Sequence, residues 1–185
     1  MQDSFGDYKV LERVGAGTKS EVFRARDTRA GRTAAVKVLT SDLAMDPVVG
    51  APFVDEAYLA QKLGHPSSAT LYDIGEQDGR PHLVYEFIQG QTITALLAGH
   101  PINPRRALEL ATQIADALAE AHALGLVHRA LRSDKVIVSL KGNAKVLDFG
   151  LGHYAAAVHR QMYAAGGAGA AAALRAMAYW APEQH

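Results

Sequence analysis

The fold of this chain is decided by one stretch, LVHRALRSDKVIVSLKGNAKVLDFG, which covers residues 126–150. Its second half holds two short apolar runs, at 136–140 and 145–149, and the turn Lys-Gly-Asn between them predicts a strand pair. The second run leads into Asp-Phe-Gly, a turn whose carboxylate, Asp148, is suited to hold a metal ion. In the first half, Ala130 follows His-Arg, where a phosphoryl-transfer site would carry an acid. The stretch leaves two readings open, an enzyme or a binding protein shaped like one.

The bulk composition is that of an ordinary globular protein. The chain has 185 residues, of which 49% are hydrophobic and 21% charged, enough for one domain or two unequal lobes. The 19 basic and 19 acidic residues cancel, so net charge gives no reason to expect a nucleic-acid partner. Cysteine is absent, which fits a reducing compartment. The N-terminus lacks a signal-peptide core and no apolar run reaches the roughly 18 residues that span a bilayer, so we expect a cytoplasmic protein without a membrane span.

The first half of the chain predicts a sheet with one inserted helix. Short β-branched or alternating runs, separated by turns rich in glycine or charge, predict five strands, at residues 8–14, 20–27, 33–39, 71–77 and 82–88. Between the third and fourth strands, residues 53–63 place apolar side chains at helical spacing, and Gly64 ends the run.

The second half predicts a long helix and then an irregular segment. A linker is expected at residues 89–93, and the clearest helix of the chain covers residues 104–124. Asn103 suits its N-cap, and Gly125 follows its last turn. Residues 155–174 are rich in alanine, which favours helix, but a Gly-Gly-Ala-Gly run interrupts them. We expect a mobile or partly helical loop there.

Two features are weak singly and gain weight from the order of the motifs around them. The glycine turn VGAGTKSEV, residues 14–22, would let a polyphosphate approach the backbone, although a hairpin that binds nothing fits it equally well. Lys37 interrupts an apolar strand, with Glu56 on the next helix as its candidate partner; the alternative is a lysine that reaches solvent from an edge strand. A hinge, a long helix, the His-Arg loop and Asp-Phe-Gly then follow in turn.

This order resembles the protein kinase family, and the bacterial serine/threonine kinases in particular. The resemblance runs from Tyr8 to Gln184 and is carried by seven motifs, VGAGTKSEVFRARD, AAVKVL, FVDEAYLAQKLGHP, YDIGEQDGRPHLVYEFIQGQTI, GLVHRALRSDKVIVS, KVLDFGLG and AYWAPEQ. It implies an α+β, protein-kinase-like fold, with a five-stranded N-lobe that contains one helix and a partial, mainly helical C-lobe.

The resemblance also implies domain limits. The domain would cover residues 8–185, with an N-lobe at 8–88, a hinge at 86–91 and a partial C-lobe at 92–185. Because the sequence stops just past the Ala-Pro-Glu motif, we expect a truncated domain, in which apolar faces of residues 107–124 are exposed.

Residues that match the family's motifs take their expected roles from it. Lys37 would hold the α and β phosphates of ATP and pair with Glu56, and Asp148 would bind a bridging Mg²⁺. Apolar side chains would sandwich the adenine, Tyr85 would lie at the back of its pocket, and the hinge backbone would bond its edge. The implied nucleotide-binding set is Val14, Gly15, Ala16, Gly17, Val22, Ala35, Lys37, Glu56, Tyr85, Glu86, Ile88, Lys135 and Ile137.

The departures from the family lie in the catalytic loop, which reads HRALRSDK instead of His-Arg-Asp-Leu-Lys-Pro-x-Asn. Ala130 replaces the aspartate that orients the substrate hydroxyl and accepts its proton, so no catalytic set is intact, although His128, Arg129 and Arg132 are retained. Loss of a general base lowers a rate by roughly 10²–10⁴. Lys135 replaces the asparagine that holds a second metal, and its ammonium could stand near the β and γ phosphates.

The segment after Gly150 departs as well. It contains no serine or threonine, the residues whose phosphate Arg129 would bind in the family, so only Tyr154, Tyr163 and Tyr179 could carry one. Ala176 stands where the family has a threonine that contacts the catalytic aspartate, so both partners of that contact are missing.

These residues predict a pseudokinase that binds ATP, with Mg²⁺ at one site, and acts as a regulatory or scaffolding module through a protein partner of unknown identity. The alternative is a weakly active serine/threonine protein kinase or ATPase that uses Lys37, Glu56 and Asp148. A third reading is a degenerate fragment, or a chain that folds only with a partner.

Overall fold

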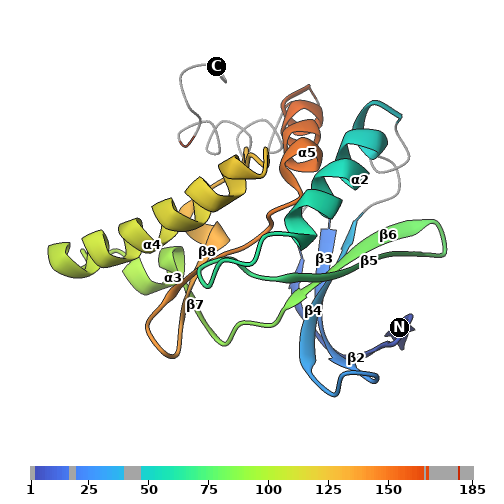
Figure 1. Cartoon of the computed structure of the whole chain (residues 1–185), viewed down its shortest axis with the longest axis horizontal. Coiled ribbons are helices and arrows are strands. Elements are labelled where there is room, and N and C mark those ends of the chain that lie inside the picture. Colours follow the sequence, from blue (N-terminus) through green and yellow to red (C-terminus); the bar gives the residue numbers. More distant parts are fainter. Residues whose placement is uncertain (1–2, 17–19, 40–46, 165, 167–178, 180–185) are drawn as a thin grey trace.

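The computed structural model describes residues 3–16, 20–39, 47–164, 166 and 179, with only the backbone described at 47–52. Two parts follow each other along the chain: a twisted antiparallel sheet with one long helix above it, and a mainly helical part that carries a small second sheet (Figure 1). This is the α+β architecture that the sequence predicts.

The larger sheet has the strand order β1-β2-β3-β4-β6-β5, and every neighbouring pair is antiparallel. Its strands are β1 (Ser4–Phe5), β2 (Tyr8–Ala16), β3 (Ser20–Asp27), β4 (Thr33–Leu39), β5 (Leu71–Gln77) and β6 (Arg80–Glu86). The five predicted strands are therefore present. The edge strand β1 lies before the predicted domain start and, with two residues, is too short for a period-2 pattern to indicate it.

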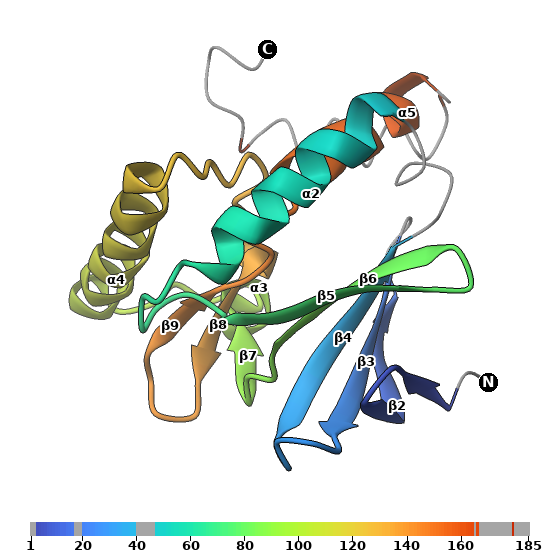
Figure 2. The same cartoon turned by 45° about the vertical axis from the view of Figure 1, so that its right-hand side comes forward.

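Helix α2 (Pro47–Gln61) begins earlier than the predicted 53–63 and lies over the sheet, beside α5 (Gly152–Ala164), as Figure 2 shows. Residues 155–174 were expected to form a mobile or partly helical loop, and their first part is helical, because α5 continues through Ala164. Its run of three alanines favours helix, and Tyr154 and Ala157 are buried where α5 lies against α2. The rest of that prediction falls largely outside the described residues.

The second sheet has the order β7-β8-β9 and is also antiparallel, with strands β7 (Gly90–Thr92), β8 (Val136–Ser139) and β9 (Ala144–Val146). The predicted strand pair is thus joined by a third strand from the segment predicted as a linker, which continues into the short helix α3 (Ile93–Leu97). Gly90 makes this pairing close, since a Cβ there would lie 2.2 Å from the Val138 carbonyl oxygen.

Helix α4 (Pro104–Ala123) agrees with its prediction to within one residue. The Asn103 side chain accepts a hydrogen bond from the Arg105 amide, and Gly125 beyond the helix takes a positive φ of 76°. One face of α4 is buried through Leu110, Ala117 and Ala121, whereas Leu108 is 70% exposed. Among the described residues, no helix combines the length and apolarity needed to cross a lipid bilayer.

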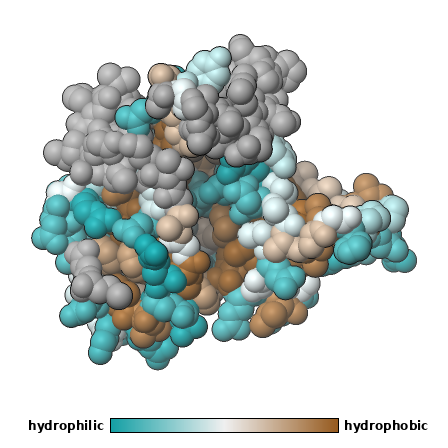
Figure 3. Space-filling view, turned by 180° about the vertical axis from the view of Figure 1, so that it is seen from behind, coloured by the Kyte–Doolittle hydropathy of each residue, from teal (hydrophilic) through white to brown (hydrophobic). Residues whose placement is uncertain are grey.

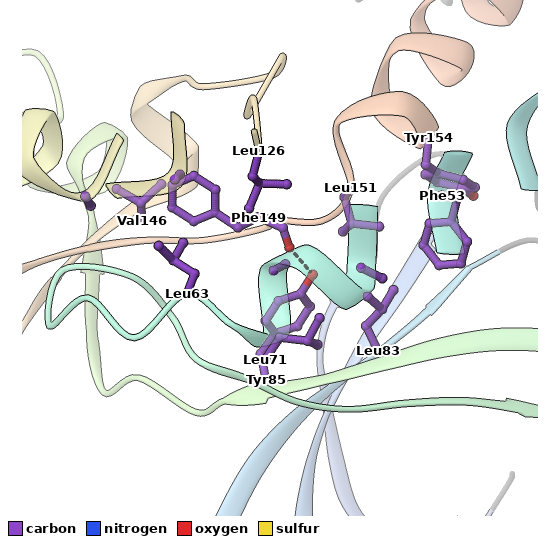
Figure 4. Packing of buried hydrophobic residues seen from close by; sticks show 14 of the residues in the cluster. Phe53, Leu63, Leu71, Leu83, Tyr85, Leu126, Val146, Phe149, Leu151 and Tyr154 are labelled. Carbon is purple, nitrogen blue, oxygen red and sulfur yellow. Dashed lines mark hydrogen bonds between the residues drawn. The ribbon is translucent and has the colours of Figure 1, made fainter. Parts of the chain in front are cut away.

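The main hydrophobic core joins the two parts. It includes Leu83 and Tyr85 of the large sheet, Phe53 of α2, and Phe149 and Leu151 after β9 (Figure 4). On the face seen in Figure 3, hydrophobic residues lie on both sides of a hollow between the two parts. Because the core spans both parts, it fixes the two walls of this hollow relative to each other.

Candidate functional site

An apolar cavity of about 220 Å³ lies between the large sheet and the second sheet. Its walls come from β2, β3 and β4 on one side and from β8 and the residues just after β9 on the other, with the end of β6 and the residues after it along its edge. It is lined by the predicted residues Val14, Val22, Ala35, Lys37, Tyr85, Glu86, Ile88, Lys135, Ile137 and Asp148, together with Ala69, Phe87 and Leu147. Residues predicted from five separate motifs thus meet around one cavity.

Four predicted residues of the nucleotide-binding set remain: Gly15, Ala16, Gly17 and Glu56. Gly15 is in β2 opposite Val22, and a Cβ on it would lie 3.7 Å from the Val22 Cβ. Ala16 pairs with Glu21, the pair of the β2–β3 hairpin that lies nearest the connection between the two strands. Gly17 falls outside the described residues. Glu56 does not line this cavity, and its contacts are given below.

A second, more polar cavity of about 320 Å³ shares three side chains with the first: Lys37, Lys135 and Asp148. The predicted loop contributes His128, Ala130 and Arg132 to its wall, together with Ser20 and Asp134. Another part of the wall comes from Leu151 and from one side of α5, through Tyr154, Ala155, Val158, His159 and Met162. The two cavities therefore form an apolar compartment that opens past two lysines into a charged one.

The Asp148 carboxylate stands at the junction of the two cavities. Its Oδ2 atom accepts from the Lys37 Nζ atom at 2.8 Å and from the Lys135 Nζ atom at 2.6 Å. Burial opposes the ionisation of Asp148, but Lys135 and Lys37 hold its pKa well below its usual range. Asp148 in turn raises the pKa of Lys135, whereas burial lowers the pKa of Lys37 in spite of Asp148.

The backbone of the Asp-Phe-Gly turn directs the side chains of Asp148 and Phe149 to different places. Asp148 has a φ of 65°, a left-handed conformation that aspartate tolerates better than most residues. Asp148 faces the cavities, while Phe149 is 1% exposed in the core and contacts the His128 ring edge-on at 5.0 Å between centroids. Gly150, with a φ of 86°, packs against α2, where a Cβ would lie 2.8 Å from the Cβ of Ala60.

The expected pairing of Lys37 with Glu56 is wrong for this structure. Lys37 pairs with Asp148, while Glu56, which is 5% exposed, accepts from the Arg129 guanidinium at 3.1 Å and from the His153 backbone N–H at 2.9 Å. His153 is in the first turn of α5, where backbone N–H groups lack partners within the helix, so Glu56 acts there as an acceptor. The guanidinium of Arg129, which the family resemblance would pair with a phosphorylated residue, is thus bound to Glu56 here.

The loop around Ala130 offers no free carboxylate. The Ala130 N–H lies 3.3 Å from the His128 Nδ1 atom, and the His128 Nε2 atom lies 2.8 Å from the Leu147 carbonyl oxygen. Asp134 accepts two bonds from Arg132, at 2.9 and 2.7 Å, which hold its pKa below its usual value although burial acts the other way. Both carboxylates that line the second cavity are thus already ion-paired.

Several residues of the site were not predicted. Leu147 and Phe87 flank predicted positions, and the alternation of side chains along a strand could have indicated Leu147. The wall provided by α5 carried no usable signal, because its residues look like an alanine-rich loop in the sequence. Glu86 is held by Lys145 through a 2.7 Å ion pair, a contact between two elements that no local pattern reveals.

The Mg²⁺ that the resemblance implies does not match the donors present. Magnesium is bound by oxygen ligands, commonly one or two carboxylates together with phosphate oxygens. Here the Asp148 Oδ2 atom already accepts from two ammonium groups. At the position of the family's metal-binding asparagine stands Lys135, whose side chain has no oxygen atom. Within the described part of the chain, no cluster of three histidine or acidic side chains could hold a metal. The expectation of Mg²⁺ at Asp148 therefore rests on the resemblance alone.

The fold and the arrangement of these motifs define a protein kinase domain. A family model described as "Protein kinase domain" matches residues 8–184. The chain belongs to this family.

Individual relatives agree with this assignment. A probable serine/threonine-protein kinase of Streptomyces coelicolor is 40% identical over 151 residues, which are 79% of this chain and 22% of the relative. Serine/threonine-protein kinase PrkC of Bacillus subtilis is 35% identical over 147 residues, or 79% of this chain and 23% of PrkC. The chain thus spans about a quarter of the length of the curated relatives it matches.

Among solved structures, the PknI kinase domain of Mycobacterium tuberculosis superimposes with a TM-score of 0.74 at 27% identity. The match covers 80% of this chain and 59% of the PknI chain. It supports the fold and the order of elements described above.

Proposed function

We propose that this chain is a pseudokinase domain that binds ATP, or a nucleotide like it, and does not transfer phosphate efficiently. The observation that carries the proposal is the pair of joined cavities. The apolar one is lined by the residues that the family uses around adenine, and the charged one has Ala130 where the catalytic acid would stand.

The apolar cavity supports nucleotide binding through its shape and its chemistry. Val22, Ala35 and Ile137 provide an apolar lining from both sides, which suits the faces of a purine ring. Lys37 and Lys135 stand where the cavity opens into the charged compartment, so a ring in the first cavity would direct its phosphates toward both ammonium groups.

Two features oppose phosphate transfer. The methyl group of Ala130 can neither orient a hydroxyl nor accept its proton, and the two neighbouring carboxylates are ion-paired. Leu151 and the α5 side chains Val158 and Met162 wall the compartment from which a hydroxyl substrate would approach. We infer that the domain acts by binding, as a regulatory or scaffolding module with a protein partner.

The alternative is a slow serine/threonine kinase or ATPase that uses Lys37, Glu56 and Asp148. It draws support from the 2.8 Å contact between Lys37 and Asp148, which keeps two of the three groups together. It further requires Glu56 to leave Arg129 and approach Lys37, which would break a pair in which Glu56 is almost fully buried.

Isothermal titration of the purified chain with ATP tests the proposal, alongside thermal denaturation with and without the nucleotide. Nucleotide at about 100 times its dissociation constant should stabilise the fold by roughly 2.7 kcal/mol. Lys37→Met should remove most of this effect. Lys141→Met is the matched control, since Lys141 is exposed in the turn between β8 and β9. Saturable binding that is equal in both variants would place the nucleotide elsewhere, and no binding by the wild type would reject the proposal.

A further inference from the structure

We propose that the site takes its nucleotide as the metal-free polyphosphate anion, with the Lys135 ammonium group in the place of a divalent cation. The ligand class is a free nucleoside di- or triphosphate. This inference rests on the proposed nucleotide-binding function and concerns the ionic form of the ligand.

The charges at the junction of the two cavities favour an anion. Lys37 and Lys135 each contribute one positive charge, and Asp148, the acid between them, contributes one negative charge. Arg132 and Asp134 in the second cavity cancel each other through their bidentate pair. One positive charge is therefore left over where the phosphates would lie.

The two lysines retain the capacity to bind phosphate oxygens while they hold Asp148. An ammonium group carries three N–H donors, so a single bond to the Asp148 Oδ2 atom leaves donors on each lysine for a ligand. Their side chains are only 12% and 24% exposed, and a charge in such a setting is less weakened by water than one at the surface. Both groups line the two cavities at once.

The backbone fixes Lys135 in this position. It ends a short 3-10 turn, Ser133–Lys135, in which its N–H donates to the Arg132 carbonyl oxygen at 2.9 Å. Its own carbonyl oxygen accepts from the Leu147 N–H at 2.8 Å, one residue before Asp148. The ammonium and the carboxylate are thus carried by two chain segments that are hydrogen-bonded to each other, so the cation is positioned before any ligand arrives.

A divalent cation would be poorly placed in the same site. At Asp148 it would stand beside two ammonium groups that already share the carboxylate oxygen, and like charges at this separation repel each other. A nucleotide that arrives with Mg²⁺ also carries less negative charge for the two lysines to bind. Added Mg²⁺ should therefore weaken nucleotide binding, the reverse of a site that recruits the metal.

Titration calorimetry of the full chain with ATP tests this, once in EDTA and once in an excess of Mg²⁺. The wild type should bind in EDTA, and Mg²⁺ should weaken binding by about tenfold or more, where tenfold corresponds to about 1.4 kcal/mol. Lys135→Asn should reverse the order, binding weakly in EDTA and more tightly with Mg²⁺. Lys141→Asn, the same change at an exposed turn lysine, should behave like the wild type.

The wild-type comparison needs no variant, so a misfolded Lys135→Asn protein would leave the test intact. Binding by the wild type only in the presence of Mg²⁺ would overturn the inference and leave the proposed nucleotide-binding function standing. Equal affinity with and without the metal would also overturn it. No binding in either buffer would reject both.

Discussion

The Tyr85 hydroxyl donates a hydrogen bond to the Phe149 backbone carbonyl oxygen over 2.8 Å (Figure 4). The bond joins the last residues of β6, next to the predicted hinge, to the turn that carries Asp148. Burial raises the pKa of the Tyr85 phenol well above its usual value, so the group remains a donor across the physiological pH range. Through this bond, the back of the apolar cavity helps to set the position of Asp148 in front of it.

Replacement of Tyr85 by phenylalanine should destabilise the fold. The ring would still fill its place, but the buried Phe149 carbonyl would lose its donor, which costs about 1–3 kcal/mol. Urea denaturation measures the change. Tyr163→Phe removes a hydroxyl from an exposed position on α5 and should leave the free energy of unfolding unchanged. Equal stability of the Tyr85 variant and the wild type would show that the bond contributes nothing.

The pair between Glu56 and Arg129 should be important for stability. Arg129→Met would remove the guanidinium that pairs with the buried Glu56 carboxylate, and loss of a hydrogen bond to a charged group of this kind costs about 1.5–3 kcal/mol. The combined variant Glu56→Gln with Arg129→Met removes the charge as well and should recover part of this loss. A double-mutant cycle in chemical denaturation measures the coupling. If Glu56 pairs with Lys37 in solution, Arg129→Met alone will have little effect.

Gly150 and Gly79 provide a matched test of the contact between the Asp-Phe-Gly turn and α2. Both have positive φ, but a Cβ at Gly79 would meet nothing within 4 Å, whereas one at Gly150 would press against Ala60. Gly79→Ala should cost about 1–2 kcal/mol from backbone conformation. Gly150→Ala should cost about 1–3 kcal/mol beyond that, from steric overlap. Similar losses in thermal or urea denaturation would argue against close packing of α2 on this turn.

The free energy of unfolding should fall as the pH is lowered from about 7.5 to 5. Burial lowers the pKa of His128 below its ordinary 6.5, and it does the same for His82 and His159. In this range the unfolded chain binds more protons than the folded chain, so acid favours unfolding. Protonation would also remove the Nδ1 acceptor that His128 presents to Ala130.

Denaturation at a series of pH values checks this dependence. His128→Gln should make the decline shallower without abolishing it, because His82 and His159 remain. His100→Gln, at an exposed position, should leave the slope as it is. The same slope in the wild type and the His128 variant would show that His128 does not contribute to the pH dependence of stability.

Much of the fold could be predicted because its signals are local. Periodicity and turn residues predict the strands of the large sheet, helix α4 with its cap at Asn103, and the strand pair β8–β9. The cavity residues could be predicted as a set, since each belongs to a motif with a fixed place in that fold. What the motifs could not provide is which side chains pair once the elements pack.

The partner of Glu56 illustrates this limit. In sequence terms, Lys37 and Arg129 are both suitable cations, and only the tertiary packing shows that Glu56 pairs with Arg129. Helix α5 could be expected only as part of an irregular segment, because alanine favours helix while the glycine run at residues 166–169 argues against it. Likewise β7 is a three-residue strand whose pairing with β8 is a tertiary contact, and a glycine there suggests a linker.

The central claim is that the domain binds a nucleotide and does not transfer its phosphate, and the most direct test is γ-phosphate transfer from labelled ATP. The purified chain is incubated at saturating ATP with Mg²⁺ or Mn²⁺ and generic protein substrates, with Asp148→Ala as the background. We predict that wild-type labelling, including labelling of the chain itself and release of free phosphate, equals that background. Robust turnover by the wild type that disappears in Asp148→Ala would contradict the account.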